Sequence, residues 1–276
     1  MRKFEYKNLN RTKIFHPGEF PLERAAQTHY IAHFCSVLRE TQNLEETNRD
    51  GATAFMNICA IPRLRKEYFN LLIAAGVNIR VIDKQWQNAL FKAAKSGNLV
   101  LVRSLLDAGL NPMQTDCDGE IPLSVALRCG NLSVAECLTG KVKTPLKIID
   151  KQGENLLHKA SWGDVVSVAK MLIQAYHFDV ETRDDAGHTA LHIAAYQGSN
   201  RMLKFLVTEA GANFNALDHE GRTPLFSGAY DGNLRTLKFL CENGADLSVK
   251  DKKGITAFQY ASDSKQFKAA ALLKGR

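Results

Sequence analysis

The sequence predicts an all-α solenoid of about eight helix-turn-helix units. Three observations support this fold class: an apolar position recurs every 33 to 35 residues, a glycine usually precedes it by four residues, and two apolar helical stretches follow it. A period of this length is typical of repeat proteins, in which every unit packs only against its neighbours. The composition of the 276 residues, 45% hydrophobic and 24% charged, supplies enough apolar material for a sizeable core.

The repeat register is set by one apolar position in each unit. The eight anchor residues, separated by steps of 33, 35, 33, 34, 34, 34 and 33, are Leu22, Phe55, Leu90, Leu123, Leu157, Leu191, Leu225 and Phe258. This register divides the chain into a basic N-terminal segment, residues 1–15, and a repeat domain, residues 16–276. The approximate units are residues 16–48, 49–83, 84–116, 117–150, 151–184, 185–218, 219–251 and 252–276.

A tight turn precedes each anchor. Glycine stands four residues before seven of the eight anchors, at Gly18, Gly51, Gly119, Gly153, Gly187, Gly221 and Gly254. Such a turn needs a positive φ, which a side chain with a Cβ disfavours. Trp86 is the exception, so we expect an altered turn in the third unit. The aspartates seven residues before the anchors are expected to accept hydrogen bonds from turn amides; they are Asp83, Asp116, Asp150, Asp184, Asp218 and Asp251.

Two helices are predicted after each anchor. Small residues such as Ala194-Ala195 follow the anchor and indicate a first helix that approaches its neighbour closely. A second apolar stripe with three- and four-residue steps, such as the one that starts at Leu234, indicates a second helix. A glycine such as Gly244 then marks the C-terminus of this second helix. Each unit is therefore predicted to be a turn followed by two helices.

Two stretches of the chain resemble the ankyrin repeat family nearly position by position. They are GHTALHIAAYQGSNRMLKFLVTEAGANFNALD, which starts at Gly187, and GRTPLFSGAYDGNLRTLKFLCENGADLSVKD, which starts at Gly221. The resemblance covers roughly residues 16–273 and implies antiparallel helix pairs with projecting β-hairpin loops, stacked into a curved solenoid. It also implies that His158 and His192 hydrogen-bond to a neighbouring turn.

No motif that carries catalysis is present. The sequence lacks the motifs GxxxxGK[ST] and GxSxG and shows no paired-carboxylate catalytic constellation. His188 and His192 are four residues apart, but no Glu follows His188 as a zinc-protease helix would require. Asp116 could start a calcium loop, but Leu127 stands where that loop needs a bidentate Glu. We therefore expect no enzymatic activity, no metal and no cofactor.

Composition and charge constrain the compartment and the partner. The chain has no apolar stretch of signal-peptide length near its start, and its six cysteines form no CxxC pair. We therefore expect a cytoplasmic protein, with secretion into a host cytosol as the alternative. The net charge of +7 favours acidic partners. Nucleic acid is a less favoured partner because no known reading-helix, zinc-finger or RNA-binding signature accompanies the charge.

The resemblance implies that a partner contacts the loop tips and the exposed end of each first helix. Five residues after the anchors, two cations are followed by three aromatics: Lys95, Arg128, Trp162, Tyr196 and Tyr230. Three residues before the anchors, a mixed polar rim is expected from Gln87, Glu120, Glu154, His188 and Arg222. Trp, Tyr and Arg are enriched in binding hot spots. The alternative for the aromatic residues is that they only pack on the next helix pair.

The most favoured function is a non-catalytic adaptor or scaffold that binds a protein or peptide on its concave face. One alternative is an inhibitor that covers a partner's site, and another is a microbial effector that acts on host proteins. We expect a monomer without a small-molecule substrate and without a membrane partner.

Overall fold

The computed structural model describes residues 20–28, 30–142 and 148–274, and in these residues it contains sixteen helices and no strand. The basic segment 1–15 and Gly18 lie outside the described residues. The helices are α1 (Pro21–Gln27), α2 (Ile31–Glu40), α3 (Ala54–Cys59), α4 (Lys66–Ala74), α5 (Ala89–Ser96), α6 (Leu99–Asp107), α7 (Pro122–Arg128), α8 (Leu132–Thr139), α9 (Leu156–Trp162), α10 (Val166–Tyr176), α11 (Ala190–Gln197), α12 (Asn200–Thr208), α13 (Pro224–Asp231), α14 (Leu234–Glu242), α15 (Ala257–Asp263) and α16 (Phe267–Lys274).

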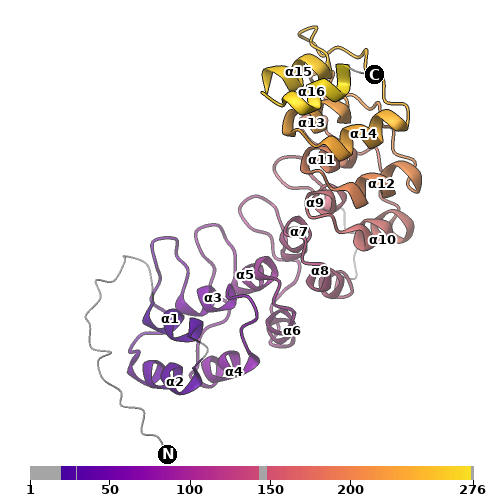
Figure 1. The fold of residues 1–276 in the computed structure, drawn as a ribbon. Coiled ribbons are helices and arrows are strands. Elements are labelled where there is room, and N and C mark those ends of the chain that lie inside the picture. The colour runs from indigo at the N-terminus through magenta and orange to yellow at the C-terminus, as the bar shows by residue number, and fades with distance from the viewer. Residues whose placement is uncertain (1–19, 29, 143–147, 275–276) are drawn as a thin grey trace, which may run out of the picture.

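The helices form two rows in a curved stack (Figure 1). Each odd-numbered helix packs against the next odd-numbered helix, and these make the first row. From α4 onward the even-numbered helices pack in the same way and make the second row. Figure 1 shows the first row and the long loops on the inner side of the curve and the second row on its outer side. The predicted all-α repeat solenoid is confirmed.

Long loops connect one helix pair to the next. The described loops contain isolated β-bridges, at Thr47–Thr53, Ile149–Asn155 and Lys250–Thr256, in place of the strands of a β-hairpin. Neighbouring loop tips are joined by a backbone hydrogen bond of 2.8–3.0 Å, donated by Lys84, Cys117, Lys151, Asp185, His219 and Lys252 to the preceding loop. The tips therefore form a continuous ladder along the stack, which fixes the position of each loop against the next.

The prediction of an altered turn at Trp86 is wrong. Trp86 has a φ of 62°, close to the 82° of Gly119 in the next unit. Its amide donates to the carbonyl of Asp83 across 2.9 Å, and the amide of Gly119 donates in the same way to Asp116. The loop ladder on both sides holds the backbone of this turn, so the protein tolerates a left-handed conformation that costs a residue with a Cβ about 1–2 kcal/mol.

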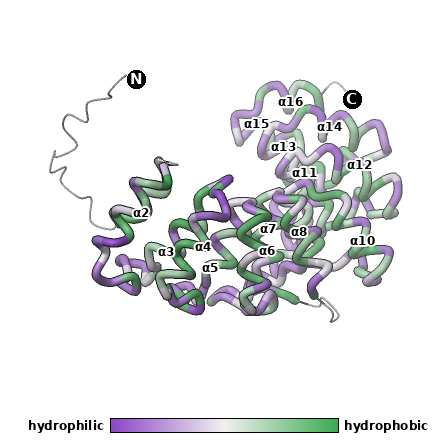
Figure 2. Tube along the Cα trace, turned by 90° about the horizontal axis from the view of Figure 1, so that it is seen from below, coloured by the Kyte–Doolittle hydropathy of each residue, from purple (hydrophilic) through white to green (hydrophobic). Residues whose placement is uncertain are grey.

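The core runs through the stack between the two rows. The small residues Ala93, Ala94, Ala194 and Ala195 are fully buried in the first row, as predicted, and let adjacent helices approach closely. Gly228 continues this series, since a Cβ there would lie 3.0 Å from Cγ2 of Thr236. Figure 2 shows apolar segments recurring along the stack with hydrophilic segments between them. Each fully buried Leu or Phe contributes about 1.5–3 kcal/mol to folding.

Side-chain amides also tie neighbouring helix pairs together. Asn131 Nδ2 donates to the carbonyls of Ala94 and Lys95 across 2.8 and 2.9 Å, at the end of α5. Asn233 Nδ2 donates across 2.7 Å to the carbonyl of Tyr196, in the last turn of α11. These bonds pair carbonyls at the C-terminal end of a helix, where the regular i to i+4 hydrogen bonds run out. They also fix the ends of α5 and α11, which border the candidate site.

Candidate partner-binding groove

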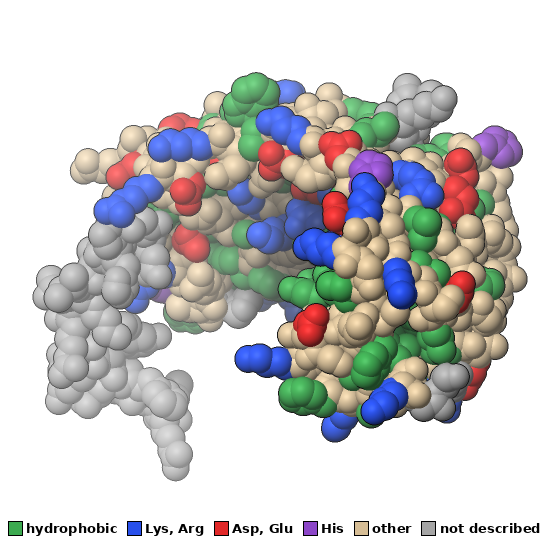
Figure 3. Space-filling model, turned by 90° about the horizontal axis from the view of Figure 1, so that it is seen from above, with side chains coloured by type: hydrophobic (Ala, Val, Ile, Leu, Met, Phe, Trp, Pro, Cys, Tyr) green, Lys and Arg blue, Asp and Glu red, His purple; other side chains and the backbone are tan. Residues whose placement is uncertain are grey.

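The predicted contact residues lie in the angle between the first row and the long loops. The residues five after the anchors occupy the last turn of α5, α7, α9, α11 and α13, and they are Lys95, Arg128, Trp162, Tyr196 and Tyr230. The residues three before the anchors end the loops that lead into these helices, and they are Gln87, Glu120, Glu154, His188 and Arg222. We call this surface the groove. In Figure 3, the face shown is hollowed, and Lys and Arg side chains gather around the hollow.

The three predicted aromatic residues form a row of contacting rings. The ring centroids of Trp162 and Tyr196 are 5.9 Å apart in an edge-to-face arrangement, and those of Tyr196 and Tyr230 are 6.1 Å apart and stacked. Tyr260 extends the row, with its ring centroid 5.7 Å from that of Tyr230. Tyr196 and Tyr230 are 37% and 47% exposed. The rings therefore pack against one another and still present apolar surface to solvent.

Sequence reasoning missed Tyr260 because it lies two residues after its anchor and not five. The same position holds Lys92 in the third unit and Lys159 in the fifth. Both lysines also enter the groove, where Lys92 Nζ lies 2.6 Å from Oδ2 of Asp83. Long amphipathic side chains at this position of a first-row helix are the signal that could have identified Tyr260.

The turn aspartates have a double role. As predicted, one oxygen accepts turn amides; Asp218 Oδ1, for example, accepts from the amides of Glu220 and Arg222 at 2.8 Å. The second oxygen faces the groove and binds a donor or a cation there. These pairs are Asp83 with Lys92, Asp116 with Gln87, Asp150 with Lys159, Asp184 with His188, and Asp218 with Arg222.

Lys159 is the centre of a buried ionic cluster. Its Nζ lies 3.1 Å from Glu120 Oε1 and 2.5 Å from both Asp150 Oδ2 and Glu154 Oε2, and its side chain is only 6% exposed. Burial disfavours the charge, but hydrogen bonds to Asp150 and Glu154 outweigh it and raise the pKa of Lys159 above its usual value. The buried carboxylates therefore have a permanent counter-ion.

Glu120 and Glu154 also hold two groove side chains in place. The guanidinium of Arg128 donates to both oxygens of Glu120, at 3.3 and 2.9 Å. The indole Nε1 of Trp162 donates to Oε1 of Glu154 across 2.8 Å. These two predicted rim residues are thus engaged with neighbouring groove residues. Lys95, at the N-terminal side of the row, is exposed.

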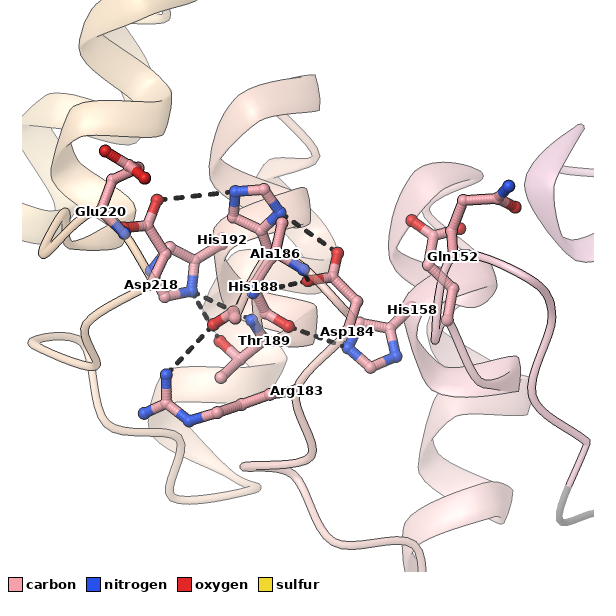
Figure 4. Close-up of polar contacts among 12 residues, drawn as sticks. Gln152, His158, Arg183, Asp184, Ala186, His188, Thr189, His192, Asp218 and Glu220 are labelled. Carbon is pink, nitrogen blue, oxygen red and sulfur yellow. Dashed lines mark hydrogen bonds and ion pairs between the residues drawn. The ribbon is translucent and has the colours of Figure 1, made fainter.

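His188 lies between two carboxylates from successive loops (Figure 4). Its Nδ1 is 3.1 Å from Asp184 Oδ2, and its Nε2 is 3.6 Å from Asp218 Oδ2. Hydrogen bonds to these two carboxylates raise the pKa of His188 to about 9, so the ring is protonated at neutral pH. Burial works against the charge of Asp218, but the hydrogen bond from His188 helps to lower its pKa to about 2.

The neighbouring His192 differs from His188 in its protonation state. Its Nδ1 accepts from the amide of Thr189 and its Nε2 donates to the carbonyl of Arg222, both across 3.1 Å. Burial lowers the pKa of His192 to about 4, so this ring is neutral. His158 makes the equivalent bond to the carbonyl of His188. Both histidines therefore connect successive loops, as the resemblance implied.

The aromatic row lines a pocket of about 310 Å³ at the C-terminal half of the groove. The walls include Trp162, Tyr196, Tyr230 and Tyr260, together with Ile193 and Phe226. The charged lining residues are His188, Asp218 and Arg222. An apolar concave surface with a few polar groups is the usual form of a binding pocket. In the described residues, no group of His, Cys, Asp and Glu could hold a metal ion.

Comparison with known proteins identifies the class. The family described as "Ankyrin repeats (3 copies)" matches residues 58–145, 137–218, 157–251 and 201–275, which together cover most of the chain. The chain therefore belongs to the ankyrin repeat family, whose members are generally protein-interaction modules and are typically without enzymatic activity.

Two curated relatives match parts of the chain. Over 97 residues it is 35% identical to E3 ubiquitin-protein ligase KEG of Arabidopsis thaliana. This matched segment covers 35% of this chain and 6% of the ligase. Over 161 residues it is 26% identical to Alpha-latrotoxin-Lg1a of Latrodectus geometricus. This matched segment covers 56% of this chain and 11% of the toxin. The chain thus spans only a small fraction of either relative.

Within the described residues, no helix is long and apolar enough to cross a membrane.

Proposed function

We propose that this protein is a non-catalytic adaptor or scaffold that binds a protein or peptide segment in the groove. The aromatic row is the observation that carries the proposal. Tyr196 and Tyr230 are each more than a third exposed although they sit on first-row helices whose other faces are buried. Rings held in this way bury a large area at little conformational cost when a partner covers them.

The groove is held in its shape by fixed contacts. Trp162 is tied to Glu154, and the stacked rings of Tyr196 and Tyr230 are 6.1 Å apart. The carbonyl of Tyr196 is further tied to Asn233. A surface that is ordered before binding loses little entropy when the partner arrives, so more of the contact energy contributes to affinity. This supports recognition by a rigid surface.

Site-specific cross-linking tests the proposal. Tyr230→p-benzoylphenylalanine places a photoreactive group in the groove, and Tyr176→p-benzoylphenylalanine places it at the end of α10 in the second row. Tyr176 is a matched control because it is also a partly exposed tyrosine, at 36%. We expect a partner protein to be cross-linked from position 230 and not from position 176. Equal cross-linking from both positions, or none from position 230, would contradict the proposed binding surface.

A triple variant gives the corresponding loss of function. Trp162→Ala, Tyr196→Ala and Tyr230→Ala together should abolish binding of the partner found by cross-linking, since each hot-spot residue contributes about 2 kcal/mol or more. Circular dichroism and thermal melting of the triple variant separate loss of binding from loss of fold. Unchanged binding by the folded triple variant would place the binding site elsewhere.

A further inference from the structure

The pocket beside the aromatic row is apolar on its walls and charged at one side. Ile193, Phe226 and the four rings of the row supply the apolar surface, and the charged residues come from the loops before α11 and α13. A volume of about 310 Å³ is at the lower end of the range of about 300–1,000 Å³ for ligand pockets. The pocket therefore suits one large side chain and its immediate neighbours.

The accessible charge of the pocket is positive. The side chains of His188 and Arg222 are 33% and 27% exposed, whereas that of Asp218 is 4% exposed. Asp218 is also fully engaged, because Oδ1 accepts two amides and Oδ2 accepts from Arg222 Nε across 3.1 Å and faces His188. A ligand in the pocket meets the two cations and not the carboxylate that accompanies them.

The guanidinium of Arg222 retains N–H donors that make no hydrogen bond within the described residues. Its Nε donates to Asp218, and its Nη1 donates to the hydroxyl of Tyr260 across 3.1 Å. The guanidinium carbon lies 5.8 Å from the centre of the Tyr260 ring. No hydrogen bond joins Nη2 to any residue in the described part of the chain. Since a guanidinium carries five N–H donors in one plane, Arg222 can still receive a carboxylate at the edge of the aromatic wall.

We propose that the pocket is the anchor site for a peptide segment that carries an aromatic side chain next to a carboxylate. The aromatic side chain packs against Tyr196, Tyr230 and Tyr260, and the carboxylate pairs with the guanidinium of Arg222. This inference rests on the proposed function and specifies the chemistry of the bound segment. The charge complementarity comes from Arg222 and His188, and the apolar complementarity comes from the row.

A cationic ligand fits the same pocket poorly. An aromatic cage for a methylated ammonium needs ring faces around a common centre and no competing cation. Here the rings of Tyr196 and Tyr230 are stacked, with 21° between their planes, and the two partly exposed charged side chains of the pocket are both cations. The position of Arg222 therefore selects for an anion beside the aromatic side chain.

Selection from a random peptide library displayed on phage tests this inference. The full chain is the bait, and peptides retained by wild type but not by Tyr230→Ala are synthesised and measured by fluorescence anisotropy. Tyr176→Ala, on the outer side of the stack, is the control that should retain the same peptides. We expect the selected peptides to share an aromatic residue with Asp or Glu within two positions of it.

The second step measures the coupling between the peptide carboxylate and Arg222. Changing the peptide's Glu to Gln, or Asp to Asn, should weaken binding to wild type about tenfold, the effect of losing one charge-assisted hydrogen bond. The same change should have almost no effect on binding to Arg222→Gln. Arg222→Lys keeps a cation beside Asp218 but loses the planar donor, so its response should be intermediate; Arg235→Gln on α14 should respond like wild type. Thermal melting shows which variants are folded.

The outcomes separate this inference from the proposed function. If the library yields no peptide that depends on Tyr230, the peptide-binding groove itself is contradicted. If peptides depend on Tyr230 but tolerate loss of the carboxylate, or carry lysine in its place, the groove stands and the acidic-aromatic specificity is overturned. If the effect of the peptide carboxylate on affinity disappears in folded Arg222→Gln, the inference is supported.

Discussion

Trp162 donates its indole hydrogen to Glu154, in the loop that leads into its own helix, across 2.8 Å. The same glutamate contacts Lys159 Nζ at 2.5 Å. The first ring of the aromatic row is thereby connected to the buried ionic cluster. The shape of the proposed binding surface depends on charge pairs beneath it, and the stability of those pairs can be measured separately from binding.

Lys159→Met should destabilise the protein strongly. It removes the cation that is paired with Asp150 and Glu154 and leaves Glu120 only its pair with Arg128, and breaking a buried ion pair in this way costs about 3–5 kcal/mol. Urea unfolding measures the change. Lys170→Met is the control, since Lys170 and Glu209 form a pair that is about half exposed and worth about 1 kcal/mol or less. Equal losses for the two variants would show that the buried cluster contributes no more to stability than an exposed ion pair.

His188 makes the stability depend on pH on the alkaline side. Its pKa rises from 6.5 to about 9 on folding, so the folded state holds the proton more tightly. This contribution is complete below about pH 6.5 and is lost as the pH rises towards 9. The free energy of unfolding of wild type should therefore fall across this window more steeply than that of His188→Gln. His219→Gln, which alters an exposed histidine, should keep the wild-type slope; identical slopes for wild type and His188→Gln would refute the assignment.

Gly163→Ala should be destabilising for steric reasons. A Cβ at Gly163 would overlap the carbonyl oxygen of Leu127 and lie 2.6 Å from the amide nitrogen of Gly130, so α7 and α9 would have to separate. We expect a loss of about 3 kcal/mol, at the upper end of overpacking effects. Gly140→Ala is the matched control, since its φ is also negative and its nearest neighbour would be 3.6 Å away. A comparable loss of stability in both variants would argue against the close approach of α7 and α9 at Gly163.

Trp86 allows the strain of a left-handed turn to be measured. Trp86→Gly and Trp86→Ala remove the same ring, but only the alanine variant keeps a Cβ at a φ of 62°. The glycine variant should be the more stable of the two by about 1 kcal/mol, the usual cost of this conformation. Chemical unfolding of both variants provides the comparison. An alanine variant of equal or greater stability would mean that the turn relaxes to another conformation.

The sequence was sufficient to predict the repeat, the turn aspartates and three of the four aromatic residues of the row, because these recur at fixed distances from the anchors; Tyr260 lies at another offset. It did not predict the turn at Trp86, since its backbone is imposed by the ladder between neighbouring loops. It also did not show that Glu120 and Glu154 converge on Lys159. The register defines which side of the stack a residue occupies, but the reach of a long side chain between units depends on the three-dimensional packing.

The emission of Trp162 tests the central claim most directly. The chain has two tryptophans, so Trp86→Phe leaves Trp162 as the single reporter within the aromatic row. Titration with a peptide selected on the wild-type protein should shift the emission to shorter wavelengths, reduce quenching by acrylamide, and saturate at the affinity found by anisotropy. A peptide that binds with that affinity while both the emission and the quenching of Trp162 stay unchanged would contradict binding in the groove.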